Sequence, residues 1–284
     1  MRFGCCMGLA TFLNPSTSRS SLLKSLSLQE KLNEIPSMME ALEKNGFDFV
    51  EGEVFLLSPE GNSDDFKAFK EKIGSFSIKP EVFSAFIPPD LKVVGPNVDK
   101  VRLKRYLARS IPRAKEVGGK VIIWGSGISR SYPEGFSREE AYEQMEEFLH
   151  SAADSAKENE MHLGIEHINR GESNTINSLK EAFTLAKRVN RKEVQLMLDF
   201  EHFMLEKEEI STLESCKGRI IHVHLSDRDR KCPGDGDYPF SSLFKTLKKI
   251  NYQERISLEC NLQELGTESK RGLDYIKSLC EKES

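Results

Sequence analysis

Short apolar segments alternate with amphipathic helical segments along the whole chain, and this alternation restricts the possible folds more than any other feature. The helical segments have the apolar spacing of surface helices, as in 28–46, 99–119 and 137–160. One strand and its helix take about 35 residues, which is typical of a barrel of eight such units. The eight predicted strands are 2–8, 46–51, 79–86, 119–125, 162–168, 194–199, 219–225 and 255–260. We therefore predict an α/β fold, a single (β/α)₈ TIM barrel.

The main alternative for such a chain is an open, doubly wound parallel sheet. That fold usually carries a glycine-rich turn of the form GxGxxG after its first strand, and no such turn follows residues 2–8. A length of 284 residues suits one barrel domain over 1–284. The segment 11–27 is long for a first loop, and a long loop at the carboxyl end of a barrel strand is a candidate lid.

Composition and charge argue against several classes of protein. The chain has 41 Lys and Arg residues against 45 Asp and Glu, spread without a basic block, so we expect no nucleic-acid partner. No apolar stretch approaches the roughly 20 residues of a membrane span, and the first residues lack the cleavage site of a signal peptide. The six cysteines form no CxxC pair, which indicates reduced thiols. Together these features predict a cytoplasmic protein.

Polar side chains stand in one phase at the ends of the last four predicted strands. Side chains alternate across a strand, so the apolar phase packs against the outer helices and the other phase points into the barrel. The carboxyl ends of the strands are where barrel enzymes hold their chemistry. We expect the inward phase to bring together Glu166, Asp199, His224 and Glu259 at this end.

A divalent cation would resolve the repulsion among three carboxylates in one buried pocket. One imidazole with three carboxylates is an oxygen-rich set that favours Mn²⁺ or Mg²⁺, and Co²⁺ or Zn²⁺ also fits. A single inward acid is more commonly an ion-pair partner, but four in-phase ligands on consecutive strands predict a metal site. His222 lies two residues before His224, and we expect it to be a buried, hydrogen-bonded side chain that supports this site.

Four short motifs carry a resemblance to a known superfamily. They are GIEHINRGE (164–172), MLDFEH (197–202), HVHLSDRDRKCPGDG (222–236) and SLEC (257–260). In their order and spacing they resemble the xylose isomerase-like TIM barrel superfamily of sugar and sugar-phosphate isomerases and epimerases. The similarity is greatest to the branch of D-tagatose and D-psicose 3-epimerases.

The resemblance implies a set of site residues and a reaction. It assigns metal binding to Glu166, Asp199, His224 and Glu259, and substrate binding to Glu172, His202 and Arg230. Glu166 and Glu259 would also be catalytic, because one removes a proton from a ketose and the other returns a proton to the opposite face, through a metal-stabilised cis-enediolate. The implied partner is a sugar or sugar phosphate, with the unphosphorylated form favoured. The superfamily also implies a homo-oligomer, a dimer or a tetramer.

The chain departs from the epimerase motifs next to two of the predicted ligands. Phe200 and Glu201 follow Asp199, where the epimerases usually have a small or hydroxylated residue first. Asp227 and Asp229 add negative charge to the segment after His224. These changes leave the metal ligands in place and leave the identity of the sugar open.

Three other functions are compatible with the same barrel. An inosose-type dehydratase would share the metal and the enolate but eliminate water. An apurinic-site endonuclease needs histidines at the ends of the second and third strands. The chain reads FVEGE (49–53) and SAFIPP (84–89) there, without a histidine, so this function is disfavoured. A barrel that binds a sugar without catalysis is disfavoured by the complete ligand set.

Overall fold

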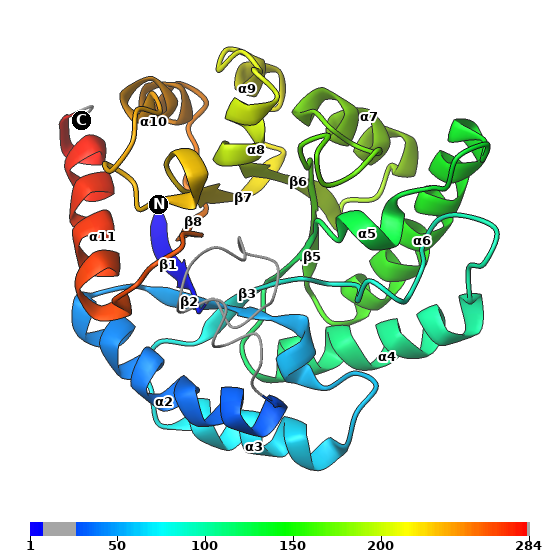
Figure 1. Ribbon diagram of the computed structural model, residues 1–284, viewed down its shortest axis with the longest axis horizontal. Coiled ribbons are helices and arrows are strands. Elements are labelled where there is room, and N and C mark those ends of the chain that lie inside the picture. The colour runs from blue at the N-terminus through cyan, green and yellow to red at the C-terminus, as the bar shows by residue number, and fades with distance from the viewer. Residues whose placement is uncertain (8–26, 283–284) are drawn as a thin grey trace.

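Eight parallel strands close into one barrel, which confirms the predicted fold (Figure 1). The computed structural model describes residues 1–7 and 27–282, and in it each strand pairs with its neighbours in sequence while β1 pairs with β8. Each predicted strand is found, with its ends shifted by a few residues at most. The strands are β1 (Arg2–Cys6), β2 (Phe49–Glu53), β3 (Pro80–Ser84), β4 (Val121–Trp124), β5 (His162–Glu166), β6 (Val194–Asp199), β7 (Ile220–Leu225) and β8 (Arg255–Leu258).

Helices form a ring around the strands (Figure 1). They are α2 (Leu28–Asn45), α3 (Ser63–Gly74), α4 (Lys100–Glu116), α5 (Gly127–Arg130), α6 (Arg138–Glu158), α7 (Leu179–Val189), α8 (Phe200–Leu205), α9 (Thr212–Ser215), α10 (Phe240–Lys249) and α11 (Leu265–Lys282), with 3-10 helices η1 (Val54–Leu57) and η2 (Arg228–Arg230). None of the described helices combines the length and apolar character needed to cross a bilayer. The predicted lid, 11–27, lies outside the described residues except for Ser27, which caps α2 in a capping box with Glu30.

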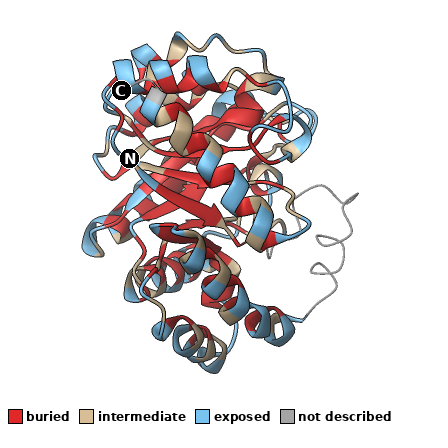
Figure 2. Cartoon of the chain, turned by 90° about the vertical axis from the view of Figure 1, so that its left-hand side faces the viewer, coloured by how far each residue is buried: buried red, intermediate tan, exposed pale blue. Residues whose placement is uncertain are grey.

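The main apolar core lies between the strands and the inner faces of the helices. Helix α7 shows why: its buried residues Leu179, Ala182, Leu185, Ala186 and Val189 follow the i, i+3, i+4 spacing of one helix face. Figure 2 shows this arrangement from the side, with buried strands inside helices that expose their outer faces. The outward side chains of each strand therefore pack against the helices, and the inward side chains fill the barrel interior and its carboxyl end.

A second, smaller apolar cluster fills the inside of the barrel. It consists of Phe49, Val82, Val121, Ile123 and Met197. Gly4 on β1 makes room for it, because a Cβ at this position would lie 2.3 Å from the Phe49 ring. The barrel interior is thus closed by apolar side chains beneath the carboxyl ends of the strands, and the inward polar residues gather above this plug.

Candidate metal centre and active site

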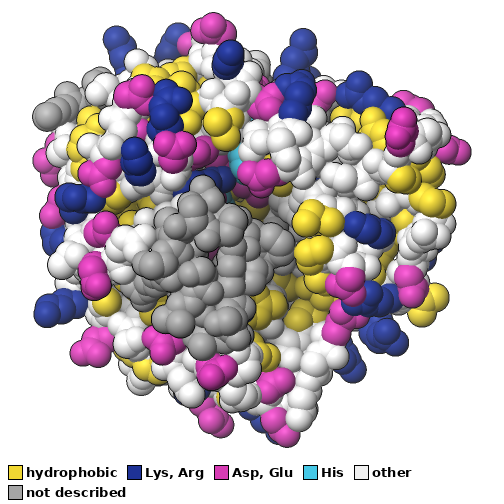
Figure 3. Space-filling view, in the orientation of Figure 1, with side chains coloured by type: hydrophobic (Ala, Val, Ile, Leu, Met, Phe, Trp, Pro, Cys, Tyr) yellow, Lys and Arg dark blue, Asp and Glu magenta, His cyan; other side chains and the backbone are white. Residues whose placement is uncertain are grey.

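The four predicted metal ligands come together at the carboxyl ends of adjacent strands. Glu166 and Asp199 end β5 and β6, His224 is the last residue but one of β7, and Glu259 directly follows β8. One ligand atom from each lies within 4.8 Å of the other three. A backbone hydrogen bond of 3.0 Å from Glu259 N to Leu225 O joins the ends of β7 and β8. The space-filling view shows histidine and acidic side chains reaching the surface near the centre of this face (Figure 3).

The His224 ring faces all three carboxylates with one nitrogen. Its Nδ1 lies 3.2 Å from Glu259 Oε2, 3.7 Å from Asp199 Oδ2 and 3.8 Å from Glu166 Oε1. This nitrogen is buried and has no hydrogen bond of good geometry. A buried imidazole nitrogen surrounded by three carboxylate oxygens is a set of donors that fits a divalent cation.

Two of the carboxyl groups have a raised affinity for protons. Burial, reinforced by the carboxylates of Glu259 and Asp199, raises the pKa of Glu166 to about 8. Burial also raises the pKa of Glu259 above its usual range. Burial acts in the same direction on Asp199, but the Arg230 guanidinium and the His202 and His224 imidazoles together outweigh it and hold the pKa of Asp199 well below its ordinary value. Glu166 is therefore suited to accept and return a proton near neutral pH, and Glu259 keeps its proton to a higher pH than an ordinary carboxyl group, whereas Asp199 stays ionised.

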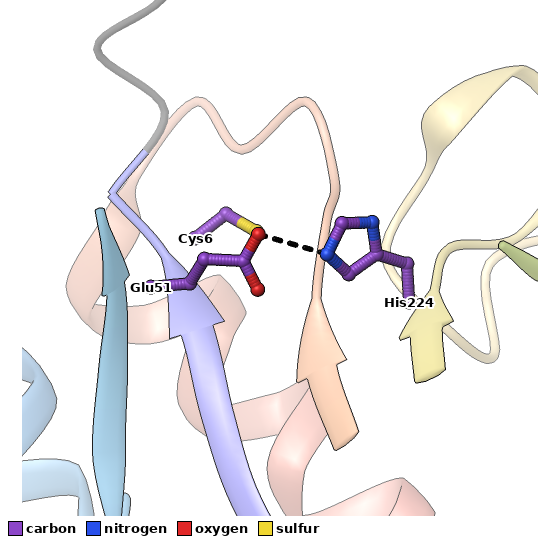
Figure 4. Close-up of side chains that lie close together, drawn as sticks. All are labelled: Cys6, Glu51 and His224. Atoms are coloured by element: carbon purple, nitrogen blue, oxygen red, sulfur yellow. Dashed lines mark hydrogen bonds and ion pairs between the residues drawn. The ribbon is translucent and has the colours of Figure 1, made fainter. Parts of the chain in front are cut away.

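A buried carboxylate that the sequence analysis did not single out lies behind His224. Glu51 on β2 contacts His224 Nε2 at 2.8 Å and His222 Nε2 at 3.0 Å, one carboxylate oxygen to each. Figure 4 shows Glu51 and His224 pointing toward one another, with Cys6 beside them. His222 is fully buried and hydrogen-bonded, as predicted. The sequence did contain a signal for this residue, because side-chain alternation places Glu51 in the same inward phase as Phe49.

Arg230 and His202, two of the three predicted substrate-binding residues, lie directly against the candidate metal ligands. Arg230 Nη1 is 2.6 Å from Asp199 Oδ2 and 2.7 Å from Glu259 Oε2. Arg230 Nη2 is 3.1 Å from His202 Nε2. The backbone N–H of His202 donates to Asp199 Oδ1 at 2.9 Å, so Asp199 also caps helix α8.

Glu172, the third predicted substrate-binding residue, lies on the exposed rim of the site. Asn169 connects it to the interior: its Nδ2 donates to Glu172 Oε1 at 2.8 Å and lies 2.9 Å from His202 Nδ1. The sequence analysis did not single out Asn169. The three predicted substrate residues therefore form a path from the rim to the metal ligands.

Glu201 holds the backbone of the segment that carries Arg230. Its carboxylate accepts hydrogen bonds from Asp229 N at 3.1 Å, Arg230 N at 2.8 Å and Ser226 Oγ at 3.1 Å. Both Asp229 (φ 62°) and Arg230 (φ 56°) have left-handed backbone conformations, which are unfavourable for residues with side chains. The acidic Glu201, which departs from the epimerase motif, thus stabilises an unusual loop conformation.

Asp227 holds the rest of the same loop. Its buried carboxylate accepts from Gly234 N at 3.1 Å, Gly236 N at 2.9 Å and Tyr238 N at 3.1 Å. Gly236 permits this close approach, because a Cβ there would lie 2.3 Å from Asp227 Oδ1. The negative charges of Asp227 and Glu201 therefore face backbone amides of the chain itself.

We expect the two carboxylates to protect different amides from hydrogen exchange. Glu201→Gln should speed exchange at the amides of Asp229 and Arg230 by about 10- to 100-fold, since hydrogen bonds to a charged group contribute about 1.5–3 kcal/mol. Asp227→Asn is the matched control and should speed exchange at Gly234 and Gly236 instead. Amide exchange measured by NMR distinguishes the two patterns, and uniform acceleration by both variants would contradict separate roles.

A buried arginine supports the strand that ends in Glu166. Arg130 is fully buried and donates to Trp124 O at 3.0 Å and Glu166 O at 2.8 Å. Gly125 leaves room for the acid, since a Cβ there would lie 2.1 Å from Glu166 Oε2. Trp124 itself is buried and packs against Phe148 at 5.1 Å between ring centroids, so it belongs to the core.

Comparisons with known proteins agree with this architecture. The chain is 28% identical to a D-psicose 3-epimerase of Enterocloster bolteae over 137 residues, which cover 47% of this chain and 46% of that enzyme. It is 27% identical to the 3-dehydro-D-guloside 4-epimerase of Escherichia coli (strain K12) over 175 residues, which cover 58% of this chain and 67% of that enzyme. The chain thus spans about half the length of the first relative.

The fold and the family model cover more of the chain than these relatives do. A crystal structure of D-psicose 3-epimerase in the presence of D-fructose superposes with a TM-score of 0.80 and 16% identity, covering 99% of each chain, and supports the fold. Residues 39–279 match the family described as xylose isomerase-like TIM barrel. Because this match includes most of the barrel, the chain belongs to the xylose isomerase-like TIM barrel family.

Proposed function

We propose that this chain is a divalent-metal-dependent ketose 3-epimerase that acts on unphosphorylated sugars. The observation that carries the proposal is the convergence of Glu166, Asp199, His224 and Glu259 within 4.8 Å of one another, with two of the three acids at raised pKa values. The Nδ1 atom of His224 faces all three carboxylates without a hydrogen bond of good geometry, which suits it to bind a metal ion between them. The similarity to D-psicose 3-epimerases supports the same reaction type.

The residues at the centre fit Mn²⁺ or Mg²⁺, as an oxygen-rich set with a single imidazole. When bound, such an ion would polarise the ketose carbonyl and stabilise the negative charge that develops as the neighbouring carbon loses a proton. Asp199 stays ionised and His224 offers Nδ1, so both are suited to hold the ion throughout the reaction.

Glu166 and Glu259 would transfer the proton. They come from β5 and β8, which two strands separate in the barrel. One carboxylate removes the proton from carbon 3, and the other, protonated, donates a proton to the opposite face and so inverts the carbon. Arg230, His202 and Glu172 would bind hydroxyl groups and fix the orientation of the sugar.

Internal carboxylates occupy several of the backbone amides that could cradle a phosphate. In TIM barrels phosphate commonly binds at the loops after the seventh and eighth strands. Here the carboxylates of Asp227 and Glu201 accept hydrogen bonds from backbone amides of the loop after β7. After β8, the Glu268 carboxylate accepts hydrogen bonds from Gln263 N at 2.5 Å and Glu264 N at 2.8 Å. These internal carboxylates would repel a phosphate, which supports an unphosphorylated substrate.

The expected setting is a homo-oligomer in the cytoplasm, with no nucleic-acid partner. Cys5, Cys6, Cys216, Cys232 and Cys260 are thiols in the structure, which is compatible with a reducing compartment. Sedimentation of the purified protein would distinguish a monomer from the dimer or tetramer that the family resemblance implies.

Removal and return of the metal provides the direct test of function. Chelation should abolish epimerisation of a panel of ketoses, and Mn²⁺ should restore it. In D₂O, the product should gain deuterium at carbon 3, as followed by NMR. Loss of water from a polyol would instead indicate the alternative dehydratase. An absence of metal-restored turnover on ketoses and ketose phosphates alike would contradict the proposal.

Mn²⁺ affinity should rise with pH up to about pH 8. In the metal-free protein the pKa of Glu166 is raised to about 8, and a bound ion requires the ionised carboxylate, so binding below this pH must release a proton. We expect the association constant to fall by at least about tenfold for each pH unit below 8, because Glu259, whose pKa is also raised, can add to the protons released. Calorimetric titrations in two buffers of different ionisation enthalpy would count the released protons, and an affinity independent of pH would contradict the assignment of Glu166 as a ligand.

A further inference from the structure

We propose that Glu51 is a positioning residue that fixes the tautomer and orientation of His224 and thereby strengthens metal binding. The inference rests on the metal centre of the proposed function. Glu51 belongs to β2, whereas the four candidate ligands come from the ends of the last four strands. It is 1% exposed, and the two histidines that it contacts are 0% (His222) and 1% (His224) exposed.

The contacts of Glu51 place a proton on Nε2 of both imidazoles. An ionised carboxylate only accepts hydrogen bonds. Glu51 Oε1 lies 2.8 Å from His224 Nε2, and Glu51 Oε2 lies 3.0 Å from His222 Nε2, so each imidazole donates from Nε2. In the neutral ring, the form that binds a metal, the lone pair of His224 is then on Nδ1, and this is the atom that faces Glu166, Asp199 and Glu259. Glu51 therefore selects the tautomer that can bind a metal.

His222 keeps the Glu51 carboxylate in place. Its ring packs at 89° to the ring of His224, with centroids 5.0 Å apart, and edge-on to Phe49 at 6.3 Å. Because His222 holds the second carboxylate oxygen, Glu51 cannot rotate away from His224 without breaking a buried hydrogen bond. The apolar plug below, which includes Phe49, thus supports the metal centre through His222 and Glu51.

A second metal ion is the competing explanation for this cluster. Donor atoms of Cys6, Glu51 and His224 also lie within 4.8 Å of one another (Figure 4). An ion there would need Nε2 of His224 as a ligand. The His224 ring would then bind two ions, one through each nitrogen. The contacts of 2.8 and 3.0 Å are ordinary N–H···O hydrogen-bond distances and leave both imidazoles satisfied at Nε2. Hydrogen bonding accounts for the cluster without a second ion.

Mn²⁺ titration of variant proteins tests the inference without measuring turnover. Glu51→Gln keeps the size of the side chain but cannot accept from both imidazoles, and it should weaken Mn²⁺ binding by about 10- to 100-fold. Glu81→Gln is the matched control: Glu81 is likewise a carboxylate on a strand, but it is only partly buried and pairs with Arg2 and Arg255 at the amino ends of the strands. The affinity of the Glu81→Gln protein for Mn²⁺ should stay within about twofold of wild type. This change is much smaller than the loss expected when an outer-shell partner is disturbed.

NMR of Zn²⁺-loaded protein with ¹⁵N-labelled histidine gives a second readout. In the wild-type protein His224 should carry a slowly exchanging Nε2–H and bind the ion through Nδ1. In Glu51→Gln this N–H should exchange faster, whereas in Glu81→Gln it should be unchanged. A purely structural role of Glu51 would lower stability without this change at His224.

Three results would overturn the inference. They are unchanged Mn²⁺ affinity in a folded Glu51→Gln protein, coordination of Zn²⁺ by Nε2 of His224, and two ions bound per wild-type chain with one per Glu51→Gln chain. The last result would make Glu51 a ligand. A wild-type protein that binds no Mn²⁺ would contradict both proposals. A protein that shows the expected Glu51 effects but epimerises no ketose would contradict the proposed function alone.

Discussion

Glu259→Gln should lower kcat for epimerisation by about 10³-fold or more. General acid–base groups typically contribute 10²- to 10⁴-fold, and this substitution also removes a charged candidate ligand 3.2 Å from His224 Nδ1. The variant should nevertheless fold, since Gln has the same shape and can still accept from Arg230. Rates would be measured with Mn²⁺ on whichever ketose the wild-type protein converts.

The matched control is Glu264→Gln, the same substitution at an exposed position five residues further along the chain. Its kcat should equal that of the wild-type protein. Exchange of the carbon-bound hydrogen with solvent gives a second measurement. The Glu259→Gln protein retains Glu166 as a base, so it should still exchange this hydrogen in one epimer while it forms little of the other epimer. Activity of Glu259→Gln within tenfold of wild type would contradict a proton-transfer role.

Asp199→Asn should nearly abolish metal binding while leaving helix α8 intact. Asn can cap the helix through its side-chain oxygen, as Asp199 does with His202 N at 2.9 Å. It lacks the ionised carboxylate that lies 3.7 Å from His224 Nδ1. We expect Mn²⁺ affinity to fall by more than about 100-fold, beyond the usual loss from outer-shell partners, and turnover to fall with it.

Metal-dependent stability provides the measurement. At a Mn²⁺ concentration 100 times its dissociation constant, the wild-type protein should gain about 2.7 kcal/mol of unfolding free energy, whereas a variant that binds 100-fold more weakly should gain about 0.4 kcal/mol. Asp199→Ala should also lose the cap, with a further decrease of about 1 kcal/mol with or without metal. Urea denaturation of the three proteins separates these effects, and equal stabilisation of Asp199→Asn and wild type by Mn²⁺ would show that Asp199 is no ligand.

Local patterns were sufficient to predict the barrel and the four candidate ligands. The strands follow from short apolar segments between amphipathic helices, and alternation within each strand selects Glu166, Asp199, His224 and Glu259. Closure of the barrel then brings the strand ends together, so no knowledge of long-range contacts was needed.

Contacts across the barrel interior could not be predicted in the same way. Glu51 and His224 lie on β2 and β7, with β1 and β8 between them in the barrel. Their contact depends on how deeply each side chain sits inside the barrel, which the strand pattern does not specify. The sequence analysis likewise interpreted Asp227 as added negative charge and Glu201 as a departure from the epimerase motif, because a sequence does not reveal which backbone amides lack partners.

The internal carboxylates have a consequence for the free energy of ligand binding. Because Glu201 and Asp227 already order the segment that presents Arg230, the sugar proposed as substrate would not have to immobilise that backbone itself. The entropy of ordering is lost during folding, before any ligand arrives, so more of the contact energy remains for capture and retention of the sugar.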